Sequence, residues 1–171
     1  MNKGLSKLVI VAIIVIAIVF GAIAIFYFSQ NGTIKQDVYT VQNATSLQVS
    51  ADVVGGNQGS FPFNWSAANI GTTSQKIRLT IYGGESGNFS YIVKSSDQTA
   101  WKNENGTWVS GNYTEINNVW GTAWNENLNQ LKANWTGNGY VSFTNSIGDH
   151  VTITNVVINP DLPDSVFEPT P

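Results

Sequence analysis

One uncharged apolar stretch, residues 8–28, constrains this chain more than any other feature. It consists almost entirely of Ile, Val, Ala, Leu and Phe. A helix rises about 1.5 Å per residue, so this stretch would be about 30 Å long, the hydrocarbon thickness of a bilayer. Lys3 and Lys7 precede it, whereas all 11 acidic residues follow it. Because positive residues favour the cytoplasmic side, we expect a cytoplasmic N-terminus and an exported body.

Three fates of this stretch lead to three different proteins. It could be retained as a membrane anchor, removed as a secretory signal peptide, or kept as the helix of a pilin. Ala22-Ile23-Ala24 offers the small residues that a signal-peptide cleavage site needs, although Ile25 and Phe26 would then begin the mature chain.

The residues directly before the stretch favour the third fate. Lys3-Gly4-Leu5-Ser6 places a positive residue and a glycine ahead of the apolar run, and in this the sequence resembles the precursors of archaeal type IV pilins. The resemblance implies that a leader peptidase cuts between Gly4 and Leu5, so that residues 1–4 form the leader and residues 5–29 the hydrophobic helix. The same kind of leader precedes archaeal solute-binding and other surface proteins, so an anchored protein without filaments stays open.

The composition after the stretch limits the classes of function. Six cations face 11 carboxylates there, and no cluster of cations offers a site for nucleic acid. The chain has no cysteine, which excludes disulfides and thiolate metal sites. Its length allows one domain with a proper core. Charged residues are 11% of the chain, so neutral Asn, Ser, Thr and Gly supply most of the polar surface.

Alternating apolar and polar residues predict a mainly β domain over residues 37–158, between a linker at 30–36 and a Pro-rich acidic tail at 159–171. Gly-rich turns every eight to twelve residues favour an immunoglobulin-like β-sandwich. Residues 124–135 fit either a helix or a strand. We expect the tail to be extended, since its prolines disfavour helix and inner strand. Strands are predicted at residues 38–41, 47–51, 61–68, 76–81, 89–93, 140–144 and 151–158, with further short strands within 101–120.

A repeated motif, Asn-x-Ser/Thr without proline at x, predicts N-glycosylation. At four sites the middle residue is aromatic, and in a strand an inward aromatic would turn the flanking Asn outward. Aromatic and polar residues also alternate in any half-buried strand, so the pattern has a purely structural explanation too. The predicted acceptors are Asn31, Asn43, Asn64, Asn88, Asn105, Asn112 and Asn134.

The sequence gives little support to catalysis, a metal site or a cofactor. His150 is the only histidine, and its place beside Asp149 in a turn indicates a surface residue. No nucleophile elbow, phosphate loop or two-histidine metal motif occurs. We therefore expect a protein that is not an enzyme and binds no cofactor; a glycosidase pair of carboxylates is the remaining enzymatic alternative.

Six tryptophans suggest a carbohydrate-binding alternative, because exposed aromatic rings stack on sugars. Trp65, Trp108 and Trp135 lie in strand patterns and are expected in the core. The candidates for sugar stacking are Trp101, Trp120 and Trp124.

These observations together favour an extracellular filament subunit of the type IV pilin kind that serves adhesion. Its partners would be the lipid bilayer, copies of itself through residues 5–29, and cell-surface glycans. The alternative is a glycosylated β-domain on a single membrane span that acts in adhesion, envelope association or carbohydrate binding. Both place the domain outside the cell membrane.

Overall fold

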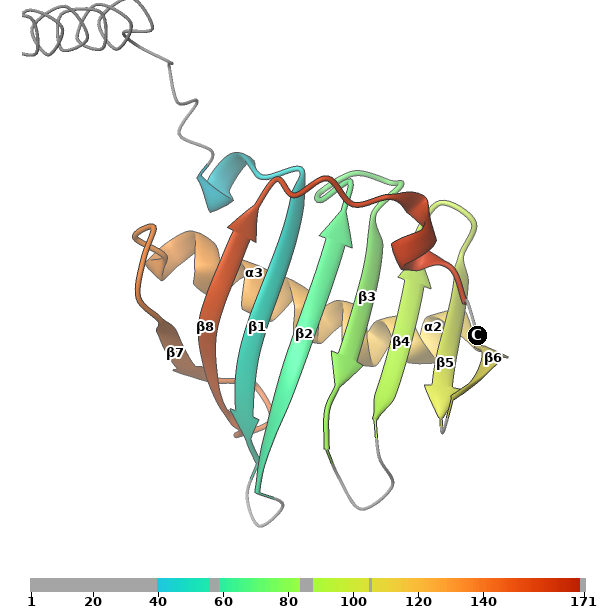
Figure 1. Cartoon of the computed structure of the whole chain (residues 1–171), viewed down its shortest axis with the longest axis horizontal. Helices are drawn as coiled ribbons and strands as arrows, with labels where there is room; N and C mark the ends of the chain where they lie inside the picture. The colour runs from blue at the N-terminus through green and yellow to red at the C-terminus, as the bar shows by residue number, and fades with distance from the viewer. Residues whose placement is uncertain (1–39, 56–58, 84–87, 105, 170–171) are drawn as a thin grey trace, which may run out of the picture. The chain divides into compact units, whose positions relative to one another are not determined.

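The computed structural model describes residues 40–55, 59–83, 88–104 and 106–169 (Figure 1). Backbone contacts divide the chain into Met1–Val38 and Tyr39–Pro171, and every described residue belongs to the second unit. The predicted leader, hydrophobic helix and linker therefore lie outside the described residues. Within the described ranges no helix is both long enough and apolar enough to cross a membrane.

All eight described strands belong to one antiparallel sheet, with the order β6-β5-β4-β3-β2-β1-β8-β7. The first six follow one another as a meander, and the β7–β8 hairpin joins the sheet on the other side of β1 (Figure 1). The strands are β1 Ser46–Val54, β2 Ser60–Ala68, β3 Lys76–Ile81, β4 Phe89–Lys94, β5 Thr99–Glu104, β6 Thr107–Gly111, β7 Val141–Thr144 and β8 His150–Ile158.

The sheet has one apolar and one largely polar face, because successive strand residues point to opposite sides. On β3, Ile77 and Leu79 are buried on the side that the helix covers, and Arg78 points the other way. We call these sides the helix face and the open face. The predicted hairpin at residues 76–81 and 89–93 is confirmed as β3 and β4.

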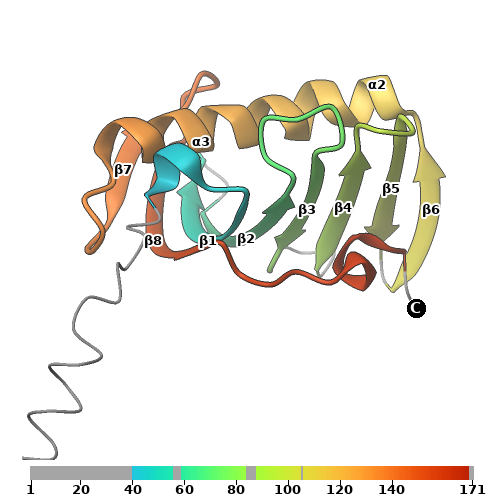
Figure 2. The ribbon, with the colours of Figure 1, turned by 90° about the horizontal axis from the view of Figure 1, so that it is seen from above.

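A helical segment returns the chain across the whole helix face (Figure 2). It consists of α2 Tyr113–Ile116, the π-helical turn η2 Asn117–Gly121 and α3 Thr122–Asn134. At about 1.5 Å per residue, residues 113–134 span roughly 33 Å, close to the width of eight strands spaced about 4.8 Å apart. The segment is therefore long enough to join β6 to β7 at opposite edges.

Residues 124–134 adopt the helical alternative, and Trp135 ends the helix in an extended conformation. Trp124, Leu128 and Leu131 recur at helical spacing and are all buried. The Trp124 ring packs on Trp65 of β2, with ring centroids 5.7 Å apart. The segment begins at Asn112, whose side-chain oxygen accepts a hydrogen bond from the Glu115 amide at 3.3 Å.

The mainly β prediction is confirmed, while the immunoglobulin-like sandwich stays unconfirmed. The described strands form one sheet, and the layer against it is the helical segment. The prediction of a strand at residues 38–41 is wrong for the part that the structure describes, because Val41 begins the 3-10 helix η1, Val41–Asn43. The Asn43 side-chain oxygen accepts hydrogen bonds from the amide and hydroxyl of Thr40, both at 3.1 Å, and this bends the chain.

The C-terminal tail is more than the extended segment that its prolines predict. It runs along the open face, opposite the helix, and forms the 3-10 helix η3 Asp164–Phe167 (Figure 2). Asn159 fixes its start, because the Asn159 side-chain oxygen accepts a hydrogen bond from the Thr45 amide at 2.8 Å. Phe167 is fully buried where η3 packs on β3 and β4, and Ile92 on the same face is also fully buried. The tail therefore belongs to the packed domain.

We expect Phe167→Ala to lower the free energy of unfolding by about 3–5 kcal/mol, because it deletes a large, fully buried ring. Chemical denaturation of the full chain measures this. Tyr140→Ala is the matched control, since Tyr140 is 72% exposed and its loss should change stability by less than about 0.5 kcal/mol. A Phe167→Ala effect as small as that of the control would show that the tail lies outside the cooperative unit.

Candidate functional site

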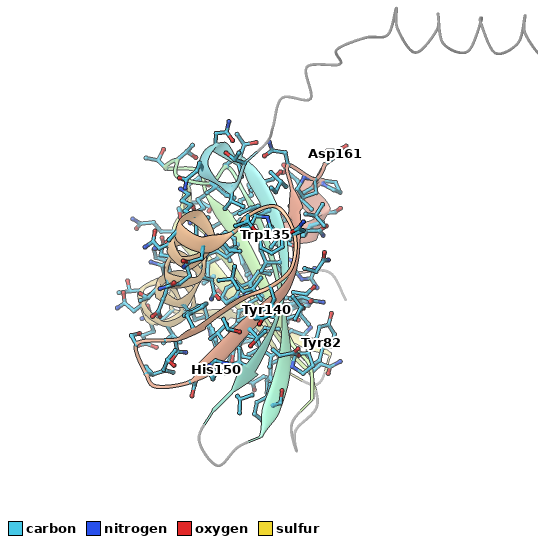
Figure 3. The ribbon with its side chains drawn as sticks, turned by 90° about the vertical axis from the view of Figure 1, so that its left-hand side faces the viewer. Tyr82, Trp135, Tyr140, His150 and Asp161 are labelled. Atoms are coloured by element: carbon cyan, nitrogen blue, oxygen red, sulfur yellow. The ribbon has the colours of Figure 1, made fainter. Side chains whose placement is uncertain are left out.

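A groove of about 410 Å³ lies on the open face, beside the tail. Strands β8, β1, β2 and β3 form its floor, Val166 of η3 contributes to one wall, and Tyr82 stands just after β3. Figure 3 shows Tyr82 on the side of the sheet away from the helix. This volume falls in the range of pockets that bind small ligands.

Strand register aligns the groove residues in two rows perpendicular to the strands. Neighbouring strands are about 4.8 Å apart, so a row of four residues is roughly 14 Å long. The first row is Asn155, Ser50, Asn64 and Thr80, and the second is Val157, Gln48, Ser66 and Arg78. All but two of these eight side chains are neutral and polar, so they offer amide and hydroxyl groups rather than charges.

Half of the polar side chains that line the groove remain available to a ligand. The Asn64 side-chain nitrogen donates a hydrogen bond to the Tyr82 hydroxyl at 3.2 Å, and Thr80 bonds with Ser90 at 3.1 Å. The side chains of Gln48, Ser50, Ser66 and Asn155 make no hydrogen bond to other described residues.

Arg78 is the only charged residue among the described residues that line the groove, and the protein already uses its guanidinium. The guanidinium donates a hydrogen bond to the Val166 carbonyl oxygen at 3.0 Å and lies 5.5 Å from the centre of the Trp108 ring. Both contacts hold the tail and β6 in place around Arg78. The groove is thus better suited to a neutral ligand than to an anion.

Two ion pairs hold the tail that walls the groove. Lys76 meets Asp164 at 2.7 Å, and Lys94 meets Glu168 at 2.5 Å. The Lys94 ammonium also lies 5.2 Å from the centre of the Trp101 ring, which helps explain how a lysine only 8% exposed is accommodated. A hydrogen bond from the Lys76 ammonium, and its charge, lower the pKa of Asp164 below its ordinary value of 3.8.

No family model matches the chain, and no curated protein is similar to it in sequence. Within the described ranges no group of three or more His, Cys, Asp or Glu side chains is placed to hold a metal ion. Rows of amides and hydroxyls, with an aromatic ring at one end, suit a ligand that carries many hydroxyl groups.

Asn31 and Asn105, together with the leader-peptidase residues Lys3, Gly4, Leu5 and Ser6, lie outside the described residues. The other five predicted glycosylation acceptors are all exposed, and their modification stays a prediction. Trp65 of β2 is buried in the core as this geometry requires, and Phe89 of β4 lies in register with Ile81 on the helix face. Asn112 and Asn134 lie at helix ends instead. Only Asn64, among the five described acceptors, lines the groove.

The choice of sugar-stacking tryptophans is wrong for Trp124, which is fully buried against the sheet. Trp101 and Trp120 are half-buried. Trp101 lies beside Lys94, and Trp120 packs on Tyr91 with ring centroids 4.9 Å apart. Among the tryptophans predicted in the core, Trp65 is 2% exposed, while Trp108 and Trp135 are half-buried.

Sequence reasoning did not identify the groove as a site. The available signal was the scarcity of charge at the outward positions of β1, β2 and β8, including Ser50, Asn64, Ser66 and Asn155. Which strands are neighbours, and so which of these residues form a row, depends on a register that the sequence pattern does not contain.

A second hollow, of about 350 Å³, lies on the helix side, between η2 and the turn that joins β7 to β8. Val119, Trp120 and Ile147 give it a mainly apolar lining. Asn127 also lines it and is 7% exposed, and its side-chain oxygen has no hydrogen-bond partner among the described residues. That oxygen has almost no accessible surface, so it is turned into the protein rather than toward a ligand. The open-face groove is therefore the stronger candidate.

The pKa of Asp164 is lower in the folded chain than the ordinary value of 3.8 expected in the unfolded chain. The pairing of Asp164 with Lys76 therefore stabilises the tail above pH 3.8, and this stabilisation is lost as the pH falls through the pKa of the folded state. We expect Lys76→Met to raise the pKa of Asp164 toward 3.8, as followed by NMR titration of its carboxyl carbon. Lys102→Met is the control, because Lys102 pairs with Glu104 instead and should leave Asp164 unchanged. An unchanged Asp164 in Lys76→Met would exclude this cause of the shift.

Proposed function

We propose that this chain is a non-catalytic extracellular surface protein whose β-domain serves adhesion, and that the open-face groove binds neutral, hydroxyl-rich ligands such as cell-surface glycans. The observation that carries the proposal is the pair of rows across four strands, in which six of the eight side chains are uncharged and polar. Amides and hydroxyls donate and accept hydrogen bonds as sugar hydroxyls do, and Tyr82 supplies an aromatic surface that is 38% exposed.

The proposal does not depend on an immunoglobulin-like sandwich. A single sheet with one polar face already provides a flat surface of the required chemistry. A second sheet packed on the open face would cover the groove, so the adhesive role favours the single-sheet arrangement.

Two forms of presentation at the surface follow from the sequence. In the first, the motif Lys3-Gly4-Leu5-Ser6 is cut after Gly4, and residues 5–29 pack with their copies in the core of a type IV pilin-like filament. In the second, the apolar stretch stays in the cell membrane as a single span and carries the glycosylated domain. The leader motif favours the first form.

Sheared surface appendages, examined by electron microscopy and by mass spectrometry of their N-termini, test the form of presentation. We expect filaments that contain this chain with Leu5 at its N-terminus. Gly4→Val should block cleavage and keep the chain in the membrane, whereas Asn2→Ala, outside the motif, should leave cleavage intact. Chains that begin at Met1 and remain confined to membranes would support the anchored form instead.

Glycan-array binding of the full chain, produced in a host that does not N-glycosylate it, tests the adhesive surface. We expect binding to neutral glycans that weakens about 2- to 10-fold in Gln48→Ala and in Asn155→Ala, since each removes one hydrogen bond of about 0.5–1.5 kcal/mol. Asn125→Ala is the matched control, because Asn125 is exposed on α3, away from the groove. A wild-type chain that binds no glycan would refute the adhesive role of the groove.

A further inference from the structure

We propose that an N-linked glycan on Asn64 lies in the open-face groove, and that glycosylation at this residue decides whether the groove is free for a ligand from outside. The inference rests on the proposed function, because it concerns the same groove. It assigns to one of the predicted acceptors a role that the others do not share.

The position of Asn64 separates it from the other described acceptors. Asn43, Asn88, Asn112 and Asn134 each lie at or next to an end of a helix or strand. Asn64 lies inside β2, with Ser50 of β1 on one side of it in register and Thr80 of β3 on the other. A sugar attached to Asn64 therefore starts on the floor of the groove, within a row of polar side chains.

The hydrogen bonds of Asn64 leave room for this modification. Its side-chain nitrogen carries two hydrogens, and one of them is donated to the Tyr82 hydroxyl at 3.2 Å. The second has no acceptor among the described residues, and Asn64 itself is exposed. A glycan can replace the second hydrogen while the first keeps its bond to Tyr82, which fixes the plane of the amide.

The attachment requires a lipid-linked oligosaccharide as donor, in which the first sugar is bound through its anomeric carbon to a phosphate oxygen. A bond forms between the Asn64 nitrogen and that carbon, the bond between the carbon and the phosphate oxygen breaks, and the displaced nitrogen proton is released. Ser66 completes the acceptor motif and also lines the groove. No oxidation or reduction is involved.

The groove has the chemistry to hold what is attached there. Gln48, Ser50 and Asn155 surround Asn64 with side chains that make no hydrogen bond to other described residues. Tyr82 and Val157, which are 38% and 41% exposed, offer apolar surface to the less polar faces of a sugar. The first sugars would thus satisfy the same groups that a ligand from outside needs, so the two exclude each other.

The test compares the full chain purified from its native cells with the same chain from a host that lacks N-glycosylation. We expect mass spectrometry of the native chain to find a glycan on Asn64, and NMR to show contacts between its first sugars and the Tyr82 ring or the Val157 methyls. In the glycan array, the native chain should bind at least 10-fold more weakly than the unglycosylated chain.

Variants made in the native cells separate the glycan from the side chains. Ser66→Ala removes the acceptor motif together with one hydroxyl of the groove, so this variant should bind as strongly from the native cells as from the host without N-glycosylation. Ser66→Thr keeps the motif and should stay blocked. Asn112→Gln removes an acceptor outside the groove and should also stay blocked.

An unmodified Asn64, or a glycan there without contacts to the groove, would overturn the inference. Binding by the unglycosylated chain would then still support the adhesive groove, whereas failure of that chain to bind would count against the proposed function itself.

Discussion

The burial of one sheet face under a single helical segment is the constraint on which the rest of this domain depends. Residues 113–134 are long enough to cross all eight strands, and Trp124 packs on Trp65 near the middle of the sheet. Because most apolar side chains of β1, β2, β3 and β8 turn toward this helix, the alternation of strand residues leaves the opposite face of these strands largely polar. The groove is thus a consequence of how the core is built, before any ligand is considered.

The tail divides the open face into two regions of different character. The row that holds Gln48 and Ser66 continues through Arg78 to Ile92 and Trp101, so it changes from polar to apolar as it passes beneath the tail. Phe167 covers the apolar end of the face, while Arg78 marks the boundary through its bond to the Val166 carbonyl oxygen. The tail therefore covers the apolar part of the open face, and the polar part stays exposed as the groove.

Local patterns in the sequence predicted the parts of the fold that depend on neighbours along the chain. The alternation around Ile77 and Leu79 identified a hairpin correctly, whereas the helix at 122–134 could not be separated from a strand by spacing alone. Contacts between distant residues were out of reach: nothing near Phe167 indicates that it is buried, and nothing near Trp124 places it against Trp65. The groove was missed for the same reason, because one of its four strands, β8, comes from a distant part of the chain and pairs with β1 in a register that the local pattern does not contain.

The pairing of β1 with β8 ties the beginning of the domain to its end. Thr45 and Asn159, which are 114 residues apart, are joined by a hydrogen bond, and the two strands beside them are neighbours in the sheet, with only β7 beyond β8. A sheet whose strands pair across such a long sequence separation forms slowly, because the two ends of the intervening chain must be brought together first. β1 is synthesised long before β8, so it must wait for β8 before it gains its second neighbour in the sheet. The core is therefore completed only after β8 and the tail, which carries the buried Phe167, have been made.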